Sequence, residues 1–507
     1  MKKNILILLA FIAIKFILQY TLIHPVYDLQ RDEYLHLDQG NHLAWGYISV
    51  PPVTSWISYI IKLLGNGVFW VKFFPALFGA LTMMLAWKIT KALKGSLYAQ
   101  VLTMLALLAP PFLRMNILFQ PNSLDIFFWT LLYYTVVRYI QTGNTRWLYT
   151  GAVALAFGIL SKYNIIIMVT GLLPAVLLTE HRKLFLRKEL YISAAITLLI
   201  ILPNIIWQYR NDFPTFHQLK ELSETQLVNV HCMDFVKDQL LYFINSFIII
   251  IAALAALLLY PPFKQYRLVF WSYTFTIALF IFFKAKSYYA VGLYPVLIAF
   301  GSVYLETVFT NGWKKYLRLV LLILVLLLSV PAVLISFPFR SPNQIQARID
   351  RYKKLGLLRW EDGKDHNLPQ DFADMLGWSE LAKKTDSIYN SLPDKEHTMV
   401  FCDNYGQAGA INYYSRFKDI RAVSFNADYI NWIDLDKPIK NMILVKEAKD
   451  SGSMQRERLL FDTVILAGKI EDPNAREMGT SIYLMSSAKT DINKLMAAEI
   501  DKRKHRR

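Results

Sequence analysis

Long apolar runs separated by short polar stretches fill the first two thirds of the chain. A helix that crosses a bilayer core needs about 20 apolar residues, so each run of roughly that length predicts one transmembrane span. The stretch 147–179 is too long for one helix and is broken by Ser161-Lys162-Tyr163-Asn164, so we interpret it as two. The pattern predicts eleven spans, at 4–24, 67–87, 96–113, 121–140, 147–160, 163–179, 190–208, 239–260, 267–283, 288–308 and 316–337.

The polar loops between these spans differ in charge. Every second loop carries at least two Lys or Arg residues, which places those loops in the cytoplasm under the positive-inside rule. The alternation requires two helices in 147–179, and it predicts a cytoplasmic N-terminus, kept as an anchor, and an external C-terminal part. The basic loops contain Lys2 and Lys3; Lys88, Lys91 and Lys94; Arg138 and Arg146; Arg182, Lys183, Arg187 and Lys188; Lys264 and Arg267; and Lys314, Lys315 and Arg318.

After residue 337 the pattern changes to short apolar runs with polar residues between them. Thr398–Cys402 and Met442–Lys446 have the length and composition of strands, whereas Ser379–Ser391 and Gly406–Tyr414 are typical of helices. Of the 38 Asp and Glu residues, 25 lie in 338–507, as expected for a soluble domain. We therefore predict a transmembrane all-α bundle over 1–337 and an external, soluble α/β domain over 338–507.

The composition supports a membrane protein. The 507 residues are 55% hydrophobic and 18% charged, whereas soluble domains average about 25% charged residues. The cytoplasmic loops explain the net charge of +17, so we predict a bilayer as partner and no nucleic acid. The two cysteines and the absence of a zinc-binding helix motif or a nucleotide-binding glycine motif predict no protein-held metal and no cofactor. A divalent ion stays an open alternative.

The first external loop, about 25–66, contains two adjacent carboxylates in Arg31-Asp32-Glu33-Tyr34. The apolar residues between Leu35 and Trp45 predict an amphipathic helix that lies in the membrane interface. Two interpretations of Asp32 and Glu33 stay open. They are a catalytic pair, or they occupy the first turn of a helix, where the free N–H groups and the helix dipole favour carboxylates.

The second external loop precedes a predicted span that carries an acid. Asp125 falls at the outer end of the otherwise apolar helix 121–140. A carboxylate in this position is costly unless it is paired or hydrated, and such groups are candidates for function. Asp125 is therefore either part of a site or the ion-pair partner of Arg114 in the same loop.

Three lysines run against the positive-inside trend. Lys162, Lys284 and Lys286 are all external on the predicted topology, and each lies near a membrane face. Snorkelling of the ammonium group to the interface explains one such lysine easily. Three of them together with Arg114 predict an anion site, and phosphate is the anion expected at a membrane surface.

Short motifs follow one another along most of the chain. They are Arg31-Asp32-Glu33-Tyr34, His42-Leu43-Ala44-Trp45-Gly46-Tyr47, Pro51-Pro52, Gln120-Pro121 with Asp125, Leu160-Ser161-Lys162-Tyr163, Lys286-Ser287-Tyr288-Tyr289 with Tyr294-Pro295, and Tyr405-Gly406-Gln407-Ala408. Their order resembles the polyprenyl-phosphate-sugar glycosyltransferases of the GT-C superfamily, in particular bacterial relatives of protein O-mannosyltransferases and lipid A aminoarabinose transferases. Many relatives have Pro-Asp where this chain has Pro121-Asn122, so we take Asp125 as the substitute for that carboxylate.

The resemblance implies transfer of a hexose or pentose, with inversion, from a polyprenyl-phosphate donor to a protein, lipid or glycan acceptor. It also implies a bacterial inner-membrane enzyme whose chemistry lies on the external, periplasmic face. A transporter or flippase of lipid-linked sugars and a non-catalytic scaffold stay as alternatives. In the enzyme, Asp32 is the expected base, Glu33 orients Asp32 or the acceptor, and Asp125 supports the first loop or the acceptor. The candidates for donor phosphate binding are Lys162, Lys284, Lys286 and Arg114. The candidates for substrate binding are Tyr34, Tyr288 and Tyr289.

Overall fold

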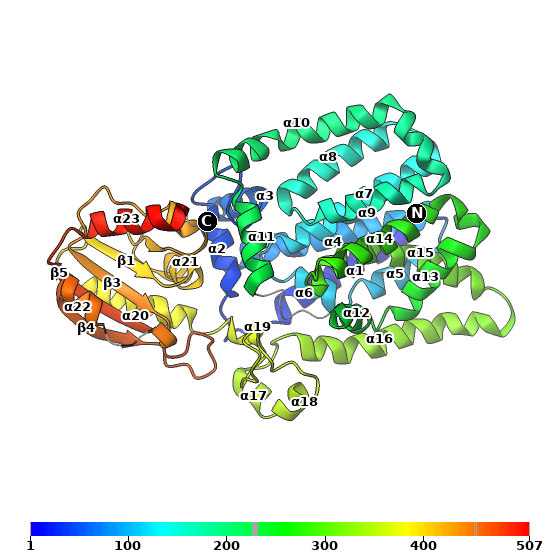
Figure 1. Ribbon diagram of the computed structural model, residues 1–507. Coiled ribbons are helices and arrows are strands. Elements are labelled where there is room, and N and C mark those ends of the chain that lie inside the picture. The colour runs from blue at the N-terminus through cyan, green and yellow to red at the C-terminus, as the bar shows by residue number, and fades with distance from the viewer. Residues whose placement is uncertain (1, 226–231, 451, 453, 506–507) are drawn as a thin grey trace. The chain divides into compact units, whose positions relative to one another are not determined.

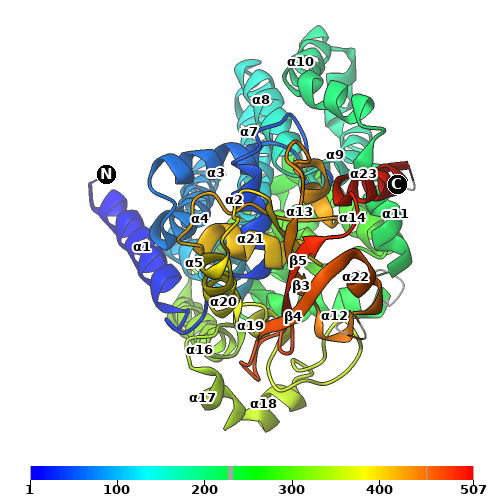
Figure 2. The same cartoon turned by 90° about the vertical axis from the view of Figure 1, so that its left-hand side faces the viewer.

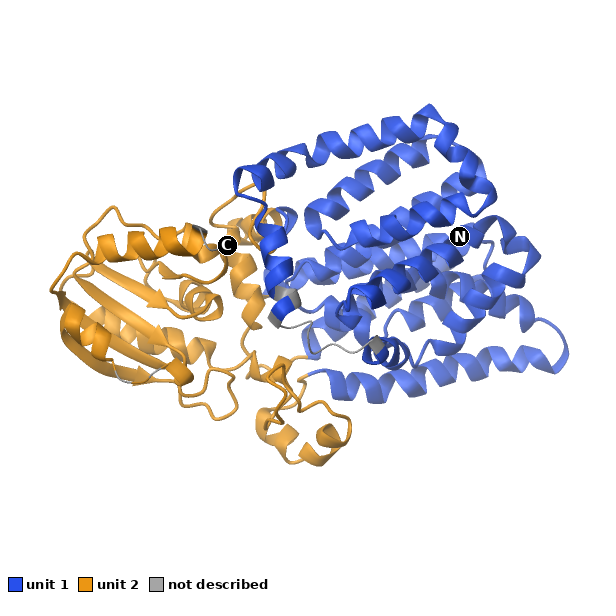
Figure 3. Ribbon diagram, viewed as in Figure 1, with its two compact units in different colours: residues 1–22, 50–54, 69–337 blue, residues 23–49, 55–68, 338–507 orange. Residues whose placement is uncertain are grey.

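A computed structural model describes residues 2–225, 232–450, 452 and 454–505. The chain forms two compact units, coloured separately in Figure 3. Unit 1 contains residues 1–22, 50–54 and 69–337, and unit 2 contains residues 23–49, 55–68 and 338–507. The predicted domain boundary at 338 coincides with one edge of unit 2. The unit also takes in most of the first external loop, which the prediction had assigned to the membrane domain.

Unit 1 consists of helices joined by short connections (Figure 1). Helices suit apolar runs of this length because they satisfy their own backbone hydrogen bonds where no water is present. The α-helices are α1 (Lys2–Thr21), α4 (Val68–Ala92), α5 (Leu97–Ala106), α6 (Pro110–Met115), α7 (Asn122–Thr142), α8 (Arg146–Ser161), α9 (Ile165–Leu177), α10 (Lys188–Arg210), α11 (Pro214–Thr225), α12 (Cys232–Tyr242), α13 (Phe247–Leu259), α14 (Arg267–Phe282), α15 (Tyr294–Val308) and α16 (Leu317–Ser336). Short 3₁₀ turns are η1 (Glu180–Leu186), η3 (Pro261–Tyr266), η4 (Ser287–Leu293) and η5 (Gly312–Tyr316).

The described part of the structure contains fewer helices long enough to span a membrane than the sequence pattern predicts. Among the described residues, five helices are long and apolar enough to cross a bilayer, and seven if two sharply bent pairs each count as one span. The predicted span 96–113 is divided into α5 and α6, because Pro110 begins a new helix and has no N–H to continue the first. The predicted span 239–260 is part of a pair, α12 and α13, bent by 108°. The total of eleven therefore stays a prediction.

The break inside 147–179 is present where the sequence predicted it. Helix α8 ends at Ser161 and α9 begins at Ile165, so two helices occupy this stretch. The interruption places Lys162 and Asn164 in a short connection between helix ends, where polar side chains are free to turn toward their neighbours.

Unit 2 contains a five-stranded mixed sheet in the order β2-β1-β3-β5-β4. The first three strands of this order run parallel, and β5 runs antiparallel to both β3 and β4. The two predicted strands are confirmed as β1 and β3, whereas the hairpin of β4 and β5 was not predicted. The strands are β1 (Thr398–Cys402), β2 (Ala422–Ser424), β3 (Asn441–Lys446), β4 (Phe461–Lys469) and β5 (Ser481–Ala488).

Helices cover both faces of this sheet, as Figure 2 shows. Alternate residues of a strand point to opposite faces. Phe401 and Leu444 accordingly share a buried cluster with Ile492 of α23. The two predicted helices are confirmed as α20 and α21 and lie on the opposite face. The helices of unit 2 are α2 (Arg31–Gln39), most of α3 (Val53–Leu63), α17 (Pro342–Gln346), α18 (Ile349–Lys354), α19 (Gln370–Ala373), α20 (Trp378–Ser391), α21 (Tyr405–Tyr414), α22 (Gln455–Leu460) and α23 (Ile492–His505), with 3₁₀ turns η6 (Ala427–Asn431) and η7 (Ala448–Asp450).

Helix α2 belongs to the core of unit 2, which corrects one prediction. Leu35 and Leu37 were expected to face the membrane interface, but both are buried, and α2 packs along α21. Polar contacts fix the pairing, since Asp38 accepts hydrogen bonds from Asn412 at 2.6 Å and from Tyr429 at 2.7 Å. The helix that exposes an apolar side in the first loop is α3, whose residues include Ile60 and Leu63.

Candidate functional site

The carboxylates of the first loop lie at the start of α2. Gln30 precedes the helix, and its side chain accepts a hydrogen bond from the backbone N–H of Asp32 at 2.9 Å. Glu33 completes the cap, because its carboxylate accepts from the backbone N–H of Gln30 at 2.8 Å. Glu33 is 2% exposed. Its contacts are those of a helix cap, which was one of the two interpretations left open, and they fix the helix turn that carries Asp32.

The Asp32 carboxylate is partly exposed and accepts a hydrogen bond from the phenol of Tyr405 at 2.6 Å. Burial and the neighbouring Asp32 carboxylate raise the pKa of Tyr405 above its ordinary value, so the phenol keeps its proton and donates. The guanidinium of Arg31 lies over the Tyr405 ring, 4.5 Å from its centre. Tyr405 is the first residue of α21, 373 positions after Asp32.

A glycine allows this close arrangement. A Cβ atom on Gly406 would lie 2.7 Å from Cγ of Arg31 and 3.0 Å from the Trp378 ring. Such distances are too short for unstrained carbon contacts, which lie at about 3.5–4.0 Å. The motif Tyr405-Gly406-Gln407-Ala408 was noted in the sequence, but only the structure shows that it contacts Arg31 and Asp32.

Tyr34, a candidate for substrate binding, lies in the core of unit 2. Its side chain is 0% exposed and packs among the rings of Trp378, Tyr413 and Tyr414 at centroid distances of 5.7–5.9 Å. In this arrangement Tyr34 anchors α2 to α20 and α21. We therefore do not include it among the residues proposed to contact substrate.

The second candidate group is a cluster in unit 1 around Lys162, and we call it the Lys162 cluster. The Lys162 ammonium donates to Oδ1 of Asn122 at 2.7 Å and lies 4.4 Å from the centre of the Tyr289 ring and 5.2 Å from that of Tyr288. Lys286 is near enough to interact electrostatically with Lys162. These two predicted phosphate ligands are therefore neighbours, and two predicted substrate-binding tyrosines lie beside them.

Asp125 belongs to the same cluster. It is 4% exposed and accepts a hydrogen bond from Asn164 at 3.0 Å, while Asn164 also donates to the backbone carbonyl of Tyr289. Lys162 is the charged group that acts on it electrostatically. The amide of Asn122 contacts Lys162 directly. The cluster thus contains one carboxylate and two lysines, and sequence reasoning had not identified Asn164.

The loop that carries Lys286 is fixed by α12. The hydroxyl of Ser287 donates to Asp238 at 2.6 Å, and the side chain of Gln239 donates to the backbone carbonyl of Ser287 at 2.8 Å. The remaining candidates are Lys284 and Arg114. Lys284 is exposed in the turn after α14, and Arg114 is buried on α6.

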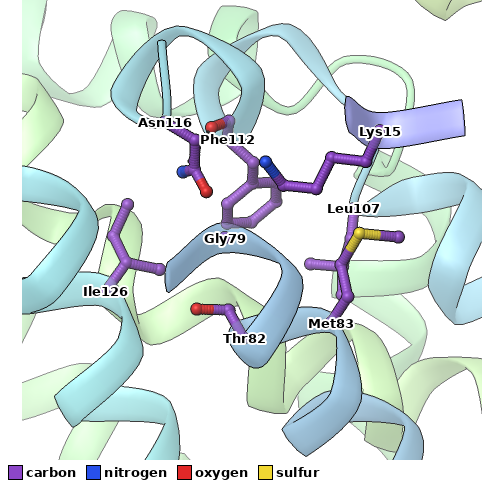
Figure 4. Close-up of a pocket in the computed structure, with 8 residues that line it drawn as sticks. All are labelled: Lys15, Gly79, Thr82, Met83, Leu107, Phe112, Asn116 and Ile126. Atoms are coloured by element: carbon purple, nitrogen blue, oxygen red, sulfur yellow. Dashed lines mark hydrogen bonds between the residues drawn. The ribbon is translucent and has the colours of Figure 1, made fainter. Parts of the chain in front are cut away.

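Lys15, which the sequence left unassigned, lies in a buried polar contact. Its ammonium donates to Gln19 at 2.9 Å, and Gln19 donates to the backbone carbonyl of Leu113 on α6. Figure 4 shows Lys15 beside Asn116 and Gly79 around a cavity of about 10 Å³, the size of a single water molecule. The contact links α1 to the helix that carries Arg114.

The described residues contain no group of three or more His, Cys, Asp and Glu side chains arranged to hold a metal ion. The expectation of no protein-held metal stays a prediction, with a divalent ion as the alternative.

Comparisons with known proteins agree with this architecture. The family described as dolichyl-phosphate-mannose-protein mannosyltransferase matches residues 49–207. The crystal structure of ArnT from Cupriavidus metallidurans bound to undecaprenyl phosphate superposes with a TM-score of 0.62 over 95% of this chain and 97% of that chain, at 15% sequence identity. The chain resembles the GT-C glycosyltransferases in sequence and in fold.

Two further relatives extend the GT-C resemblance. The lipid A galacturonosyltransferase RgtD of Rhizobium johnstonii is 24% identical over 201 residues, which are 39% of this chain and 42% of that protein. The match therefore spans less than half of that relative. The archaeal oligosaccharyltransferase AglB from Archaeoglobus fulgidus shares the fold with a TM-score of 0.51 and 12% identity, over 86% of this chain and 69% of that one.

Proposed function

We propose that this protein is a membrane glycosyltransferase that transfers a sugar from a polyprenyl-phosphate donor to an acceptor hydroxyl. The observation that carries the proposal is the Asp32 carboxylate, which the cap of α2 and the phenol of Tyr405 hold in a defined position. It occurs in a chain with an ArnT-like fold and a cluster of lysines in its helical unit. These features match the two requirements of the reaction, a base and a set of cations.

The base removes a proton from the acceptor. In the proposed step the acceptor oxygen attacks the anomeric carbon of the sugar, and its proton passes to the Asp32 carboxylate. The bond between the anomeric carbon and the phosphate oxygen breaks, so the polyprenyl phosphate leaves as a monoester. Attack from the face opposite the leaving group inverts the anomeric centre. General base catalysis by a positioned carboxylate contributes typically 10²–10⁴-fold to such a rate.

The cations stabilise the leaving group. Negative charge grows on the phosphate as the glycosidic bond breaks, and positioned cations lower the free energy of that state. Lys286 and Lys162 are the proposed donors to the phosphate, with Tyr288 and Tyr289 beside them. Asp125 and Asn122 hold Lys162 in place through the Lys162 cluster. Arg114 and Lys284 remain secondary candidates.

We place the reaction on the external face of a bacterial inner membrane. The alternation of basic loops along the sequence supports an external unit 2. Bacterial proteins are among the relatives with the same fold or a related sequence. The comparisons give no support to a transporter or flippase of lipid-linked sugars.

The test is the variant Asp32→Asn in the purified full-length protein. It keeps the shape of the side chain and removes the base, so we expect sugar transfer from labelled polyprenyl-phosphate sugars to membrane extract to fall at least about 100-fold. Asp419→Asn is the matched control, because Asp419 also accepts a hydrogen bond from a tyrosine, Tyr389, at 2.7 Å. Transfer by Asp32→Asn within a few-fold of the wild-type rate would exclude Asp32 as the base.

A further inference from the structure

Unit 2 contains a polar cavity beside Arg31 that the proposed reaction has not used. The cavity has a volume of about 360 Å³, within the range of roughly 300–1,000 Å³ found for small-molecule sites. Its walls come from the start of α2, from the loop after β3 and from the turn between β4 and β5. Five charged side chains line it, namely Arg31, Glu447, Lys449, Arg476 and Glu477.

The two carboxylates of the cavity already accept hydrogen bonds from other groups of the protein. Glu477 accepts hydrogen bonds from Asn404 at 3.3 Å, from Gln407 at 2.7 Å and from Thr480 at 2.9 Å. Glu447 accepts from Asn404 at 2.9 Å and from Lys449 at 2.8 Å. These bonds fix the carboxylates as part of the wall and use much of their capacity to accept hydrogen bonds from a ligand.

The cations of the cavity, in contrast, have donors to spare. The guanidinium of Arg31 donates no hydrogen bond to another described residue; its Nε is buried, so its terminal nitrogens are the donors that it offers to the cavity. Arg476 uses one terminal nitrogen, Nη1, for its contacts with Asp374 at 3.1 and 3.3 Å. Lys449 is 74% exposed at its side chain, so its ammonium can turn toward a ligand. A cavity that offers N–H donors from three cations favours an oxyanion, which guanidinium groups bind through paired hydrogen bonds.

The cavity is connected to Asp32 by two short chains of contacts. Arg31 precedes Asp32 and stacks on Tyr405, which donates to the Asp32 carboxylate. Asn404, which bridges Glu447 and Glu477 in the cavity wall, precedes Tyr405 and caps the same helix. A group bound in the cavity therefore lies next to the residues that position the proposed base.

We propose that this cavity is an anion subsite for the acceptor. It binds a phosphate or carboxylate group of the acceptor through Arg31, Arg476 and Lys449, and so brings a neighbouring hydroxyl toward Asp32. The assignment to the acceptor rests on the proposed function, whereas the anion subsite itself is independent of it. The donor phosphate is assigned to the Lys162 cluster, so the two substrates have separate cation sets.

Binding of small probes to the purified full-length protein in detergent tests the subsite. Equilibrium dialysis with labelled glucose 6-phosphate, glucuronate and glucose separates phosphate, carboxylate and neutral sugar. We expect at least one of the two anions to bind, with an affinity that falls as salt is added, and glucose not to bind. Arg476→Gln should weaken anion binding about tenfold or more, and Lys449→Gln about threefold. The control Lys437→Gln, which removes a cation from an exposed pair with Glu396, should leave it unchanged.

Folding and site identity have their own controls. If Arg476→Gln alone does not fold, the measurement is repeated with the double variant Asp374→Asn and Arg476→Gln, which removes both charges of this ion pair. Absence of anion binding, or equal binding by wild type, Arg476→Gln and Lys449→Gln, would overturn the subsite. So would a loss of binding in Lys286→Met instead, because the probe would then occupy the donor region.

The same assay separates this proposal from the proposed function. Asp32→Asn should lose transfer but bind the anion as the wild type does. An active Asp32→Asn variant with anion binding that depends on Arg476 would refute the assigned base and keep the subsite. An inactive Asp32→Asn variant together with anion binding that does not depend on Arg476 would keep the assigned base and refute the subsite.

Discussion

Replacement of Lys286 by Met tests the donor side of the mechanism most directly. The ammonium of Lys286 lies near that of Lys162, but Lys162 is already held by Asn122, by two tyrosine rings and by the charge of Asp125. Lys286 lies in a loop that is fixed through its neighbour Ser287, whose hydroxyl donates to Asp238. We expect both lysines to donate to the phosphate, and we replace Lys286 because loss of Lys162 would also remove its contacts with Asn122 and the two tyrosine rings.

The size of the effect follows from one charge-assisted hydrogen bond. Such a bond contributes about 1.5–3 kcal/mol, which corresponds to about ten- to 150-fold in affinity. Lys286→Met should raise the donor KM by a factor in this range and slow transfer at low donor concentration. The acceptor KM should not change, because the proposed acceptor anion subsite lies in unit 2.

The assay is a donor titration at saturating acceptor, followed by an acceptor titration at saturating donor. Lys237→Met is a suitable control, because Lys237 is 66% exposed and its ion pair with Asp234 is long, at 3.8 Å. A surface pair of this kind is worth about 0–1 kcal/mol, so its removal should leave both titrations nearly unchanged. An unchanged donor KM together with a raised acceptor KM would refute the phosphate role of Lys286.

Two further substitutions test how unit 2 is built. Gly406→Ala should lower the free energy of unfolding by about 1–3 kcal/mol, because the added Cβ meets Arg31 and the Trp378 ring. It should also reduce transfer. The control Gly67→Ala adds a Cβ that meets no atom within 4 Å, so it should leave thermal unfolding unchanged. Burial and then nearby cations lower the pKa of His42 to about 4. The folded protein therefore favours the neutral imidazole, and the free energy of unfolding should fall as the pH drops from about 6.5 to 4. With solvent screening, we expect a loss of about 1 kcal/mol at pH 5. His42→Phe, which retains a ring against Trp432, should flatten the unfolding curve between pH 7 and 5, and parallel curves for the two proteins would contradict this.

The local pattern of apolar and polar residues predicted those helices and strands that are buried on one regular face or along most of their length. The strands Thr398–Cys402 and Asn441–Lys446 lie in the middle of the sheet, and their continuous apolar sequences identified them. Strand β4 lies at the sheet edge with many exposed residues, so its pattern is weaker and it was missed. A helix bend, such as that between α12 and α13, does not change the mean hydropathy of the sequence around it. The sequence pattern therefore does not show how many spans such a pair of helices forms.

The candidate site was predicted by residue type but not by partner. Asp32 and Glu33 were found as adjacent carboxylates, and the structure separates them into a group that contacts Tyr405 and a group that caps α2. No local pattern predicts a contact between positions 373 residues apart. Asn164 was missed for another reason: a polar residue in a helix break is usual, and its role depends on its contacts with Asp125 and with the backbone carbonyl of Tyr289.

The division of unit 2 along the chain affects how the protein is made. Helix α2 leaves the ribosome early, but its partners Asn412, Tyr414 and Tyr429 follow more than 370 residues later. Until then the buried Asp38 has no hydrogen bonds from them, and Asp32 lacks the Tyr405 phenol. The carboxylate proposed as the base is thus positioned only after nearly the whole chain has been synthesised. A nascent chain cut short before residue 400 would insert its apolar helices without a working centre, and a fragment beginning at 338 would lack one of its own core helices.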